Sequence, residues 1–114
     1  MSNQHKDKVW VYSKDIEGKH PAPGVTRKVL AYCDALMCTE NQFEEGTVAA
    51  MHSHPHTQIA YAVSGRFRFT VGDEEQEIAQ GDTVYIPGGV QHGALCLEAG
   101  IVVDFFTPLR EDFI

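Results

Sequence analysis

The sequence predicts an all-β protein, a sandwich or a barrel of many short strands. Two observations carry this prediction. β-branched and aromatic residues gather in short runs, and turns that contain glycine or proline separate these runs at short intervals. In addition, no window of helical length carries an apolar stripe along one face. The clearest strand is 66–71, in which Phe67, Phe69 and Val71 alternate with polar residues, as in a half-buried strand.

The other strands follow from the turn signals that bound them. Ser64-Gly65, Gly72-Asp73 and Pro87-Gly88-Gly89 are typical chain reversals. Upstream of them, 9–12 is a short β-prone run and 18–24 is a loop. The nine predicted strands are 27–32, 36–43, 48–54, 58–63, 66–71, 75–79, 83–86, 93–97 and 101–107.

Length and composition limit the domain count and the class of partner. A chain of 114 residues has room for one domain, which we expect to span 9–114 after a flexible N-terminus of residues 1–8. The hydrophobic fraction of 43% is typical of a globular protein that forms its own core. The formal net charge of −7, without a basic run, argues against nucleic acid or a membrane surface as a partner. An anionic ligand therefore needs a local positive centre.

The cysteines indicate the compartment. Cys33, Cys38 and Cys96 are odd in number and form no C-x-x-C pair, so we expect no disulfide framework and a reducing cytoplasm. The first residues lack the apolar segment of a signal peptide, and no apolar run is long enough for a membrane span. Cys96 lies in an apolar run, which favours a core residue over a nucleophile.

The sharpest local feature is His52-Ser53-His54. Residues two positions apart on a strand project from the same face, so both imidazoles can converge on one ion. Gln58 follows at the start of the next predicted strand, and His92 comes after the Pro87-Gly88-Gly89 turn. Taken alone, the histidine-rich segment is equally consistent with an exposed turn.

The glycines around these histidines decide between the two interpretations. The two segments read Gly46-x5-His52-x-His54-x3-Gln58-x6-Gly65 and Gly81-x5-Pro87-x-Gly89-x2-His92. Together they resemble the two motifs of the cupin family, single-domain jelly-roll barrels also called double-stranded β-helices. The resemblance implies that one divalent transition metal ion (Ni, Zn, Fe, Mn or Co) is bound by His52, His54, Gln58 and His92. The ligands alone leave the identity of the metal open.

Two positions depart from the general cupin pattern. Gln58 stands where glutamate is usual, and Cys96 stands where a residue such as asparagine is usual. Three neutral imidazoles and a neutral amide leave the full charge of the ion uncompensated. Such a site is a stronger Lewis acid and a better dock for an anionic substrate. His56 follows Pro55 and is expected around the metal ligands or in solvent rather than on the ion.

One carboxylate interrupts the apolar strand predicted at 101–107. Asp104 shares a face with Val102 and Phe106, and the strand pattern leaves open whether this face or the opposite one turns inward. If it turns inward, Asp104 is partly buried and needs a partner or a chemical role. Arg110 follows the strand, and by pattern alone it is an ordinary surface arginine.

From Gly24 to Phe113 the chain resembles the small cupins of uronate catabolism, the KdgF-type pectin degradation proteins. The segments that carry this resemblance are 27–32, 52–58, 98–100 and, most specifically, Asp104-Phe105-Phe106-Thr107-Pro108-Leu109-Arg110-Glu111-Asp112-Phe113. The glutamine among the metal ligands also agrees with this family.

The resemblance implies a reaction and a role for each residue. Members of this family convert 4,5-unsaturated monouronates from pectin or alginate to linear 5-keto-4-deoxyuronates, by ring opening and tautomerisation, with a metal and no other cofactor. Asp104 then matches the catalytic carboxylate, Arg110 the arginine that acts on the substrate carboxylate, and Phe106 a wall of the sugar pocket. Which proton Asp104 transfers stays open, as does the stereochemistry of the preferred sugar.

Two other functions stay open at this level. A cupin with three histidines can bind iron and act as a metal-dependent dioxygenase. A non-catalytic sugar-acid sensor is the third reading, although such sensors usually carry an effector domain, for which 114 residues leave no room. As partners we expect a small anionic sugar and a second copy in a homodimer, because open sheet edges favour being covered.

Overall fold

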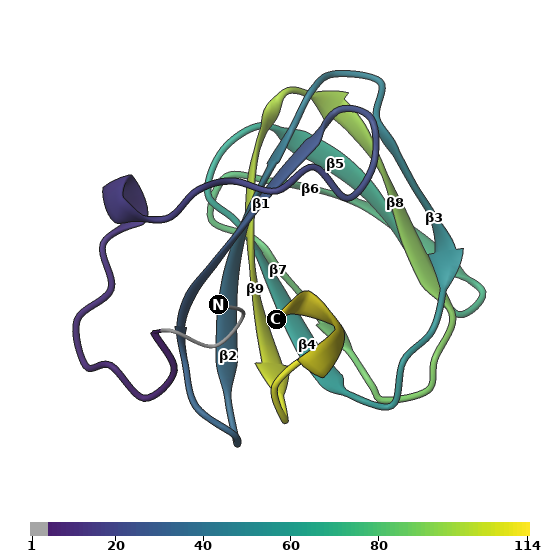
Figure 1. Cartoon of the computed structure of the whole chain (residues 1–114). Helices are drawn as coiled ribbons and strands as arrows, with labels where there is room; N and C mark the ends of the chain where they lie inside the picture. The colour runs from purple at the N-terminus through teal and green to yellow at the C-terminus, as the bar shows by residue number, and fades with distance from the viewer. Residues whose placement is uncertain (1–4) are drawn as a thin grey trace.

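The computed structural model describes residues 5–114 and consists of two antiparallel β-sheets that face each other (Figure 1). The five-stranded sheet has the order β1-β2-β9-β4-β7, and the four-stranded sheet has the order β3-β8-β5-β6. The predicted all-β barrel is therefore confirmed. Its strands are β1 (Val25–Tyr32), β2 (Met37–Phe43), β3 (Val48–His52), β4 (Thr57–Ala62), β5 (Arg66–Val71), β6 (Glu74–Ala79), β7 (Thr83–Ile86), β8 (His92–Glu98) and β9 (Gly100–Thr107).

The order of the strands brings distant parts of the sequence together. β9, near the C-terminus, lies between β2 and β4 and pairs with both. β3 pairs with β8, and this register places His52 directly opposite His92. The two histidine-bearing segments are thus neighbours in one sheet, although about a third of the chain separates them.

Two predicted elements differ from the structure. β3 ends at His52 rather than at residue 54, after an irregularity in its pairing with β8 between Ala49 and His52. Pro55 lies just beyond and has no N–H to donate to a ladder, which accounts for the early end. The β-prone run 9–12 forms no strand, because no sheet edge pairs with it. Its Val9 and Trp10 side chains remain 80% and 75% exposed, and the short 3-10 turn η1 (Ser13–Asp15) follows.

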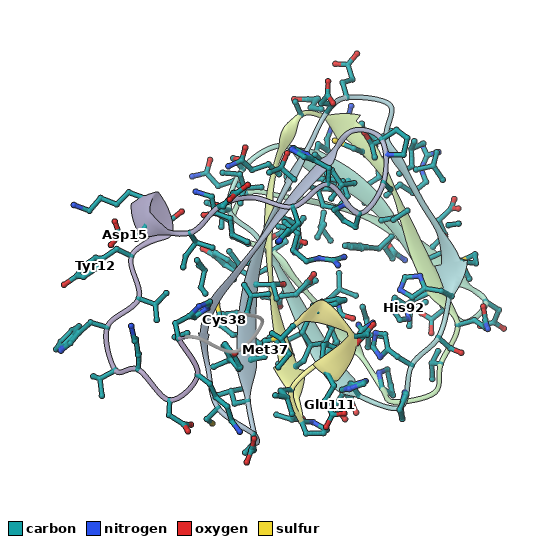
Figure 2. All side chains as sticks on the ribbon, viewed as in Figure 1. Tyr12, Asp15, Met37, Cys38, His92 and Glu111 are labelled. Carbon is teal, nitrogen blue, oxygen red and sulfur yellow. The ribbon has the colours of Figure 1, made fainter. Side chains whose placement is uncertain are left out.

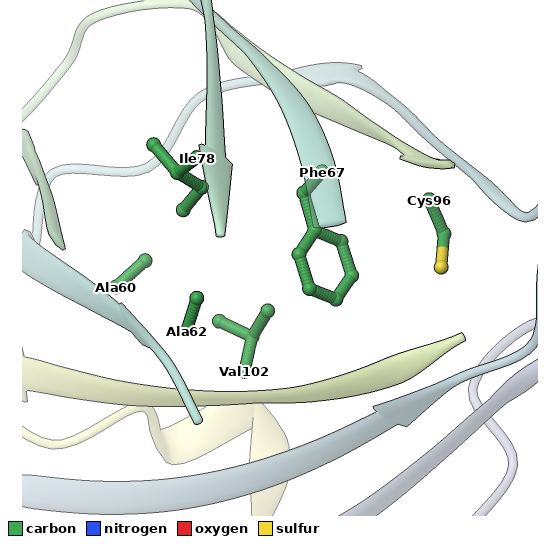
Figure 3. Packing of buried hydrophobic residues seen from close by; sticks show 6 residues of the cluster. All are labelled: Ala60, Ala62, Phe67, Ile78, Cys96 and Val102. Carbon is green, nitrogen blue, oxygen red and sulfur yellow. The ribbon is translucent and has the colours of Figure 1, made fainter. Parts of the chain in front are cut away.

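Apolar side chains fill one end of the barrel. Phe67 on β5 points across the interior toward Val102 on β9 (Figure 3). Cys96 is 2% exposed in the same cluster, which confirms the prediction that it is a core residue. Its thiol and those of Cys33 and Cys38 are free. The apolar cluster consists of Ala60, Ala62, Phe67, Ile78, Cys96 and Val102.

A smaller apolar cluster closes the other end. Tyr32, Met37 and Phe106 are buried there, and the C-terminal segment packs against them through Leu109 and Phe113. This segment ends in the 3-10 turn η2 (Glu111–Phe113), the last part of the yellow ribbon in Figure 1. The C-terminal segment is therefore packed against the barrel rather than extended as a tail.

The predicted flexible segment 1–8 falls partly outside the described residues, since residues 1–4 are not among them. Of the remainder, the Asp7 amide donates to the Tyr32 carbonyl at 2.9 Å, and the His5 ring lies 3.0 Å from the Val29 carbonyl. These contacts join the start of the described chain to β1. Across residues 5–114, every helical turn is too short to traverse a lipid bilayer.

Candidate metal centre and active site

A cavity of about 500 Å³ opens between the two sheets, on the interior side of the strands that carry the predicted site residues. It has an apolar wall and a polar wall. The apolar wall includes Val48, Phe69 and Ile86. The polar wall is formed by Arg27, Asn41, His52, Gln58, His92, Asp104 and Arg110.

Three of the four predicted metal ligands meet at one side of this cavity. The candidate ligand atoms of His52, His54 and His92 all lie within 4.8 Å of one another. The ring centroids of His92 are 4.3 Å from His52 and 4.8 Å from His54. Figure 2 shows His92 at the start of β8, beside the end of β3. These three histidines fit a metal site, as the spacing of the motifs predicts.

The loops of the two motifs hold each other in place. His54 lies just after β3, and its carbonyl accepts a hydrogen bond from the Gly89 amide at 2.8 Å. The backbone of Gly88 passes so close to Pro55 that an added Cβ would lie 2.4 Å from the Pro55 carbonyl oxygen. Only glycine allows this approach. The glycines of the second motif therefore fix where the histidines of the first motif stand.

The backbone also sets which nitrogen of each histidine would be free to bind an ion. In all three rings Nδ1 lies against a main-chain carbonyl, which can only accept a hydrogen bond, so Nδ1 carries the proton and Nε2 keeps its lone pair. Desolvation by burial lowers the pKa of His54 and of His92, which favours the neutral form that binds metals. The contacts are His52 to Ala50 (2.8 Å), His54 to His56 (3.1 Å) and His92 to Val90 (2.9 Å).

Two further observations test whether these residues fit a metal. His92 Nε2 is buried and has no hydrogen-bond partner among the described residues. His54 Nε2 lies 3.0 Å from Gln58 Oε1. Both of these atoms are acceptors, because His54 uses its proton at Nδ1 and Gln58 uses its amide group elsewhere. A cation bound by both atoms would satisfy them together with His92.

Gln58 connects the histidines to Asp104. Its side chain is 7% exposed at the start of β4, and its Nε2 donates to Asp104 Oδ1 at 2.9 Å. This bond turns the amide oxygen toward His54. The structure thus places Gln58 beside the histidine cluster with its oxygen facing inward, the orientation that a fourth ligand would need.

Asp104 faces the barrel interior, so the question that the strand pattern leaves open is answered. Its neighbours on the same face, Val102 and Phe106, are each 2% exposed, whereas Phe105 on the other face is 39% exposed. Asn41 Nδ2 donates to Asp104 Oδ2 at 3.0 Å, which complements the bond from Gln58. Burial raises the pKa of Asp104 to about 7, although the Gln58 hydrogen bond and nearby arginines oppose this rise. A carboxyl group with such a pKa can give or accept a proton near neutral pH.

Arg110 reaches the cavity from the C-terminal segment. Its side chain is only 12% exposed and donates through Nε and Nη2 to the Asp112 carboxylate at 3.0 and 2.8 Å. Its guanidinium carbon lies 5.0 Å from the Phe106 ring centre and 4.2 Å from that of Phe113. Arg110 is therefore held at the cavity, unlike the ordinary surface arginine that its pattern suggests.

His56 lies next to the cluster but outside it. Its Nε2 lies 3.1 Å from the Leu109 carbonyl, and its own carbonyl accepts the proton of His54 Nδ1. The structure therefore places it around the candidate ligands, where the sequence leads us to expect it.

Two polar residues of the cavity escape sequence reasoning. Arg27 on β1 lines the cavity and donates from Nε to Asn41 Oδ1 at 3.2 Å. Asn41 on β2 is 3% exposed and joins Arg27 to Asp104. Arg27 lies in the segment 27–32 that carries the resemblance to the KdgF-type proteins, but nothing in the sequence assigns it a role, and Asn41 lies in no such segment. The alternation of β2 could have pointed to Asn41. Met37, Thr39 and Asn41 are alternate residues of this strand and share its inward face, so a buried Met37 implies that Asn41 also faces inward.

Comparisons with known proteins agree with this geometry. A protein-family model described as "Cupin domain" matches residues 40–104, more than half of the chain. Pectin degradation protein KdgF of Dickeya dadantii (strain 3937) is 33% identical over 93 residues, which are 80% of this chain and 84% of that protein.

Two solved structures share the whole fold. The structure of KdgF from Halomonas sp. superposes with a TM-score of 0.88 at 31% identity, covering 92% of this chain and 97% of that one. An RmlC-like cupin from Shewanella frigidimarina NCIMB 400 superposes with a TM-score of 0.90 at 32% identity, covering 94% and 96%. This chain therefore belongs to the cupin family and, within it, to the KdgF-type pectin degradation proteins.

Proposed function

We propose that this protein converts 4,5-unsaturated monouronates, the sugar acids left by pectin or alginate breakdown, to linear 5-keto-4-deoxyuronates. The observation that carries the proposal is the position of Asp104, a half-buried carboxylate that accepts a hydrogen bond from Gln58 at 2.9 Å, while Gln58 in turn faces the histidine cluster. The name of the Dickeya dadantii relative, pectin degradation protein, supports the substrate class.

The reaction is an isomerisation that needs proton transfers and no redox step. The bond between C1 and the ring oxygen breaks, the C1 hydroxyl loses its proton, and C1 becomes an aldehyde. The former ring oxygen takes up a proton and becomes the enol oxygen on C5. A proton is then added at C4, the enol loses its own proton, and C5 becomes a ketone. Negative charge develops on the C5 oxygen during these steps, so a site for this reaction needs a positive centre and a proton carrier.

The residues of the cavity suit these requirements. A divalent metal held by His52, His54, Gln58 and His92 would supply Lewis-acid stabilisation of charge on the C5 oxygen. Asp104, which can exist in either protonation state near neutral pH, would take the proton from the C1 hydroxyl or deliver one to C4.

Binding of the sugar acid involves the other walls. Arg110 would attract the substrate carboxylate, and Phe106 would form the wall beside the sugar ring. A bound metal and the arginines would together provide the local positive charge that an anionic substrate needs in a protein with a formal charge of −7.

The test is turnover of unsaturated monogalacturonate, followed as the loss of ultraviolet absorbance of its C4=C5 bond. This sugar also opens spontaneously, so we would measure the metal-loaded protein against metal-stripped protein. We expect Asp104→Asn to lower the rate by about 100- to 10,000-fold, because it removes a general acid–base group. Metal content should stay at the wild-type level.

Asp73→Asn is the matched control, since Asp73 is exposed in the turn between β5 and β6. It should turn over substrate like the wild type. Wild-type turnover by Asp104→Asn would exclude Asp104 from the mechanism. A wild-type rate equal to the spontaneous rate would refute the proposed function, and oxygen uptake by the iron-loaded protein would then test the dioxygenase alternative.

A further inference from the structure

A second cation, Arg27, faces the cavity without a carboxylate partner. Among the described ion pairs of residues 5–114, none includes Arg27. Desolvation by burial lowers its pKa, while the charges of Asp104 and Asp112 oppose this effect. A half-buried cation of this kind is stabilised when an anion enters the cavity.

Arg110, by contrast, already has a partner. Its Nε and Nη2 both bind the Asp112 carboxylate, so one edge of the fork is occupied and its charge is compensated. Arg27 spends only Nε on a neutral acceptor, Asn41. Within residues 5–114 neither of its terminal amino groups has a hydrogen-bond acceptor, so both can bind a ligand in the cavity.

Arg27 is also held in one orientation. Its guanidinium carbon lies 3.8 Å above the centre of the Phe113 ring, and Nε donates to Asn41 Oδ1 at 3.2 Å. Asn41 is itself fixed by bonds from Nδ2 to Asp104 Oδ2 at 3.0 Å and to Thr39 Oγ1 at 3.2 Å. An arginine fixed in this way loses little side-chain freedom when it binds a ligand.

The position of Arg27 relative to Asp104 suggests what it binds. Asp104 is flanked by Gln58, on the side of the histidine cluster, and by Asn41, on the side of Arg27. The carboxylate of the proposed substrate is attached to C5, next to C4. A carboxylate at Arg27 would therefore bring C4 and C5 to Asp104 and leave the C5 oxygen on the side of the histidines.

We propose that Arg27 binds the carboxylate of the sugar acid, alongside Arg110, and that Asn41 and Phe113 position it for this role. The inference rests on the proposed function, because it takes the ligand to be a sugar acid. It adds a binding residue that lies on β1, far in sequence from both histidine motifs.

The experiment measures binding without turnover. Galacturonate lacks the C4=C5 bond, and galactose in addition lacks the carboxylate. We would titrate both into the metal-loaded protein by calorimetry. In Arg27→Met the Kd for galacturonate should rise by about 10- to 100-fold, the effect of losing a hydrogen-bonded charge pair. The Kd for galactose should not change.

Two variants complete the design. Arg68→Met makes the same chemical change on the outward face of β5, where Arg68 is 40% exposed, and should bind both sugars like the wild type. Arg27→Lys keeps the charge but loses the planar fork, so its Kd for galacturonate should lie between those of wild type and Arg27→Met. If Arg27→Met does not fold, the binding measurement can still be made with Arg27→Lys. Turnover kinetics should show a raised KM with a smaller change in kcat.

Equal galacturonate affinity in wild type, Arg27→Lys and Arg27→Met would overturn the inference, as would equal losses for galacturonate and galactose or no galacturonate binding by the wild type. The two proposals fail separately. Arg27-dependent galacturonate binding without accelerated ring opening would refute the proposed function and keep Arg27 as a carboxylate-binding residue. Accelerated ring opening by the wild type, together with galacturonate binding that does not depend on Arg27, would keep the proposed function and refute the role of Arg27.

Discussion

The apolar cluster and the polar wall of the cavity are built on the same strands with opposite chemistry. On β4, Gln58 faces the cavity while Ala60 and Ala62 belong to the apolar cluster. On β9, Asp104 faces the cavity and Val102, two residues earlier, belongs to the cluster. A step of two residues along one strand thus changes the interior from hydrocarbon to hydrogen-bonding groups.

The difference separates stability from chemistry. The apolar cluster contributes through burial of apolar area, roughly 1.5–3 kcal/mol for each large side chain that is fully buried. The polar wall gains little from burial, because its groups must recover the hydrogen bonds they lose to water. Asn41 shows this: it is 3% exposed, and its amide group donates to Asp104 Oδ2 and to Thr39 Oγ1. The apolar cluster therefore stabilises the barrel, and the polar wall is available to bind a ligand.

The largest expected effect comes from the apolar cluster. Phe67 is 1% exposed and packs edge-on against Phe43, with the ring centres 5.6 Å apart. Phe67→Ala should lower the free energy of unfolding by about 3–5 kcal/mol, because it leaves a cavity that the rigid sheets cannot close. Urea denaturation of the metal-free protein measures this. Arg68→Ala, on the outward face of the same strand, is the control. A loss for Phe67→Ala no larger than the control's would contradict the division into two regions.

The second largest effect is expected from a substitution in the polar wall. His92→Ala should weaken metal binding by at least about 100-fold, since even loss of a residue that only supports a ligand costs 10- to 100-fold. The free energy of unfolding of the metal-free protein should fall by only about 0.5–1.5 kcal/mol, the net contribution of the hydrogen bond from Nδ1 to the Val90 carbonyl, because Nε2 has no partner to lose.

Titration of the metal against a chelator, together with urea denaturation, tests both parts. His20→Ala is the matched control, because His20 is exposed, its ring contacts Thr26, and it is not among the clustered histidines. Unchanged metal affinity in His92→Ala would remove His92 from the metal site.

The smallest effect is expected at Gln58, which faces the cavity two residues before Ala60 of the apolar cluster. Gln58→Glu would cancel one unit of the ion's charge, so metal binding should tighten by about tenfold, or ~1.4 kcal/mol. The variant also loses the amide donor to Asp104 and puts a second carboxylate beside it, so turnover should fall. Chelator titration and the absorbance assay measure the two effects. Metal binding no tighter than in the wild type would argue against Gln58 as a ligand.

The apolar region was the easier of the two to predict. Alternation identifies Phe67 and Phe69, and every predicted strand after residue 24 has a counterpart in the structure. The histidine spacing also carries over, although β3 ends at His52 instead of residue 54. These features depend on short-range pattern, which a sequence displays directly.

The polar wall depends on pairing between distant strands. Asp104 lies in a strand that is apolar on both faces, so alternation alone could not orient it. Arg27 and Asn41 come together because β1 pairs with β2, and they reach Asp104 because β2 pairs with β9. A sequence shows none of these neighbours until the order of the strands is known.

The main-chain carbonyls that hold the three histidines have a consequence for how this centre can change. Ala50, His56 and Val90 contribute only backbone oxygen, so substitutions at these positions leave the acceptor in place. Gln58 differs, because a side chain, Asp104, orients it. The orientation of the imidazoles therefore tolerates side-chain changes at these three positions, whereas the orientation of the amide depends on keeping the carboxylate of Asp104.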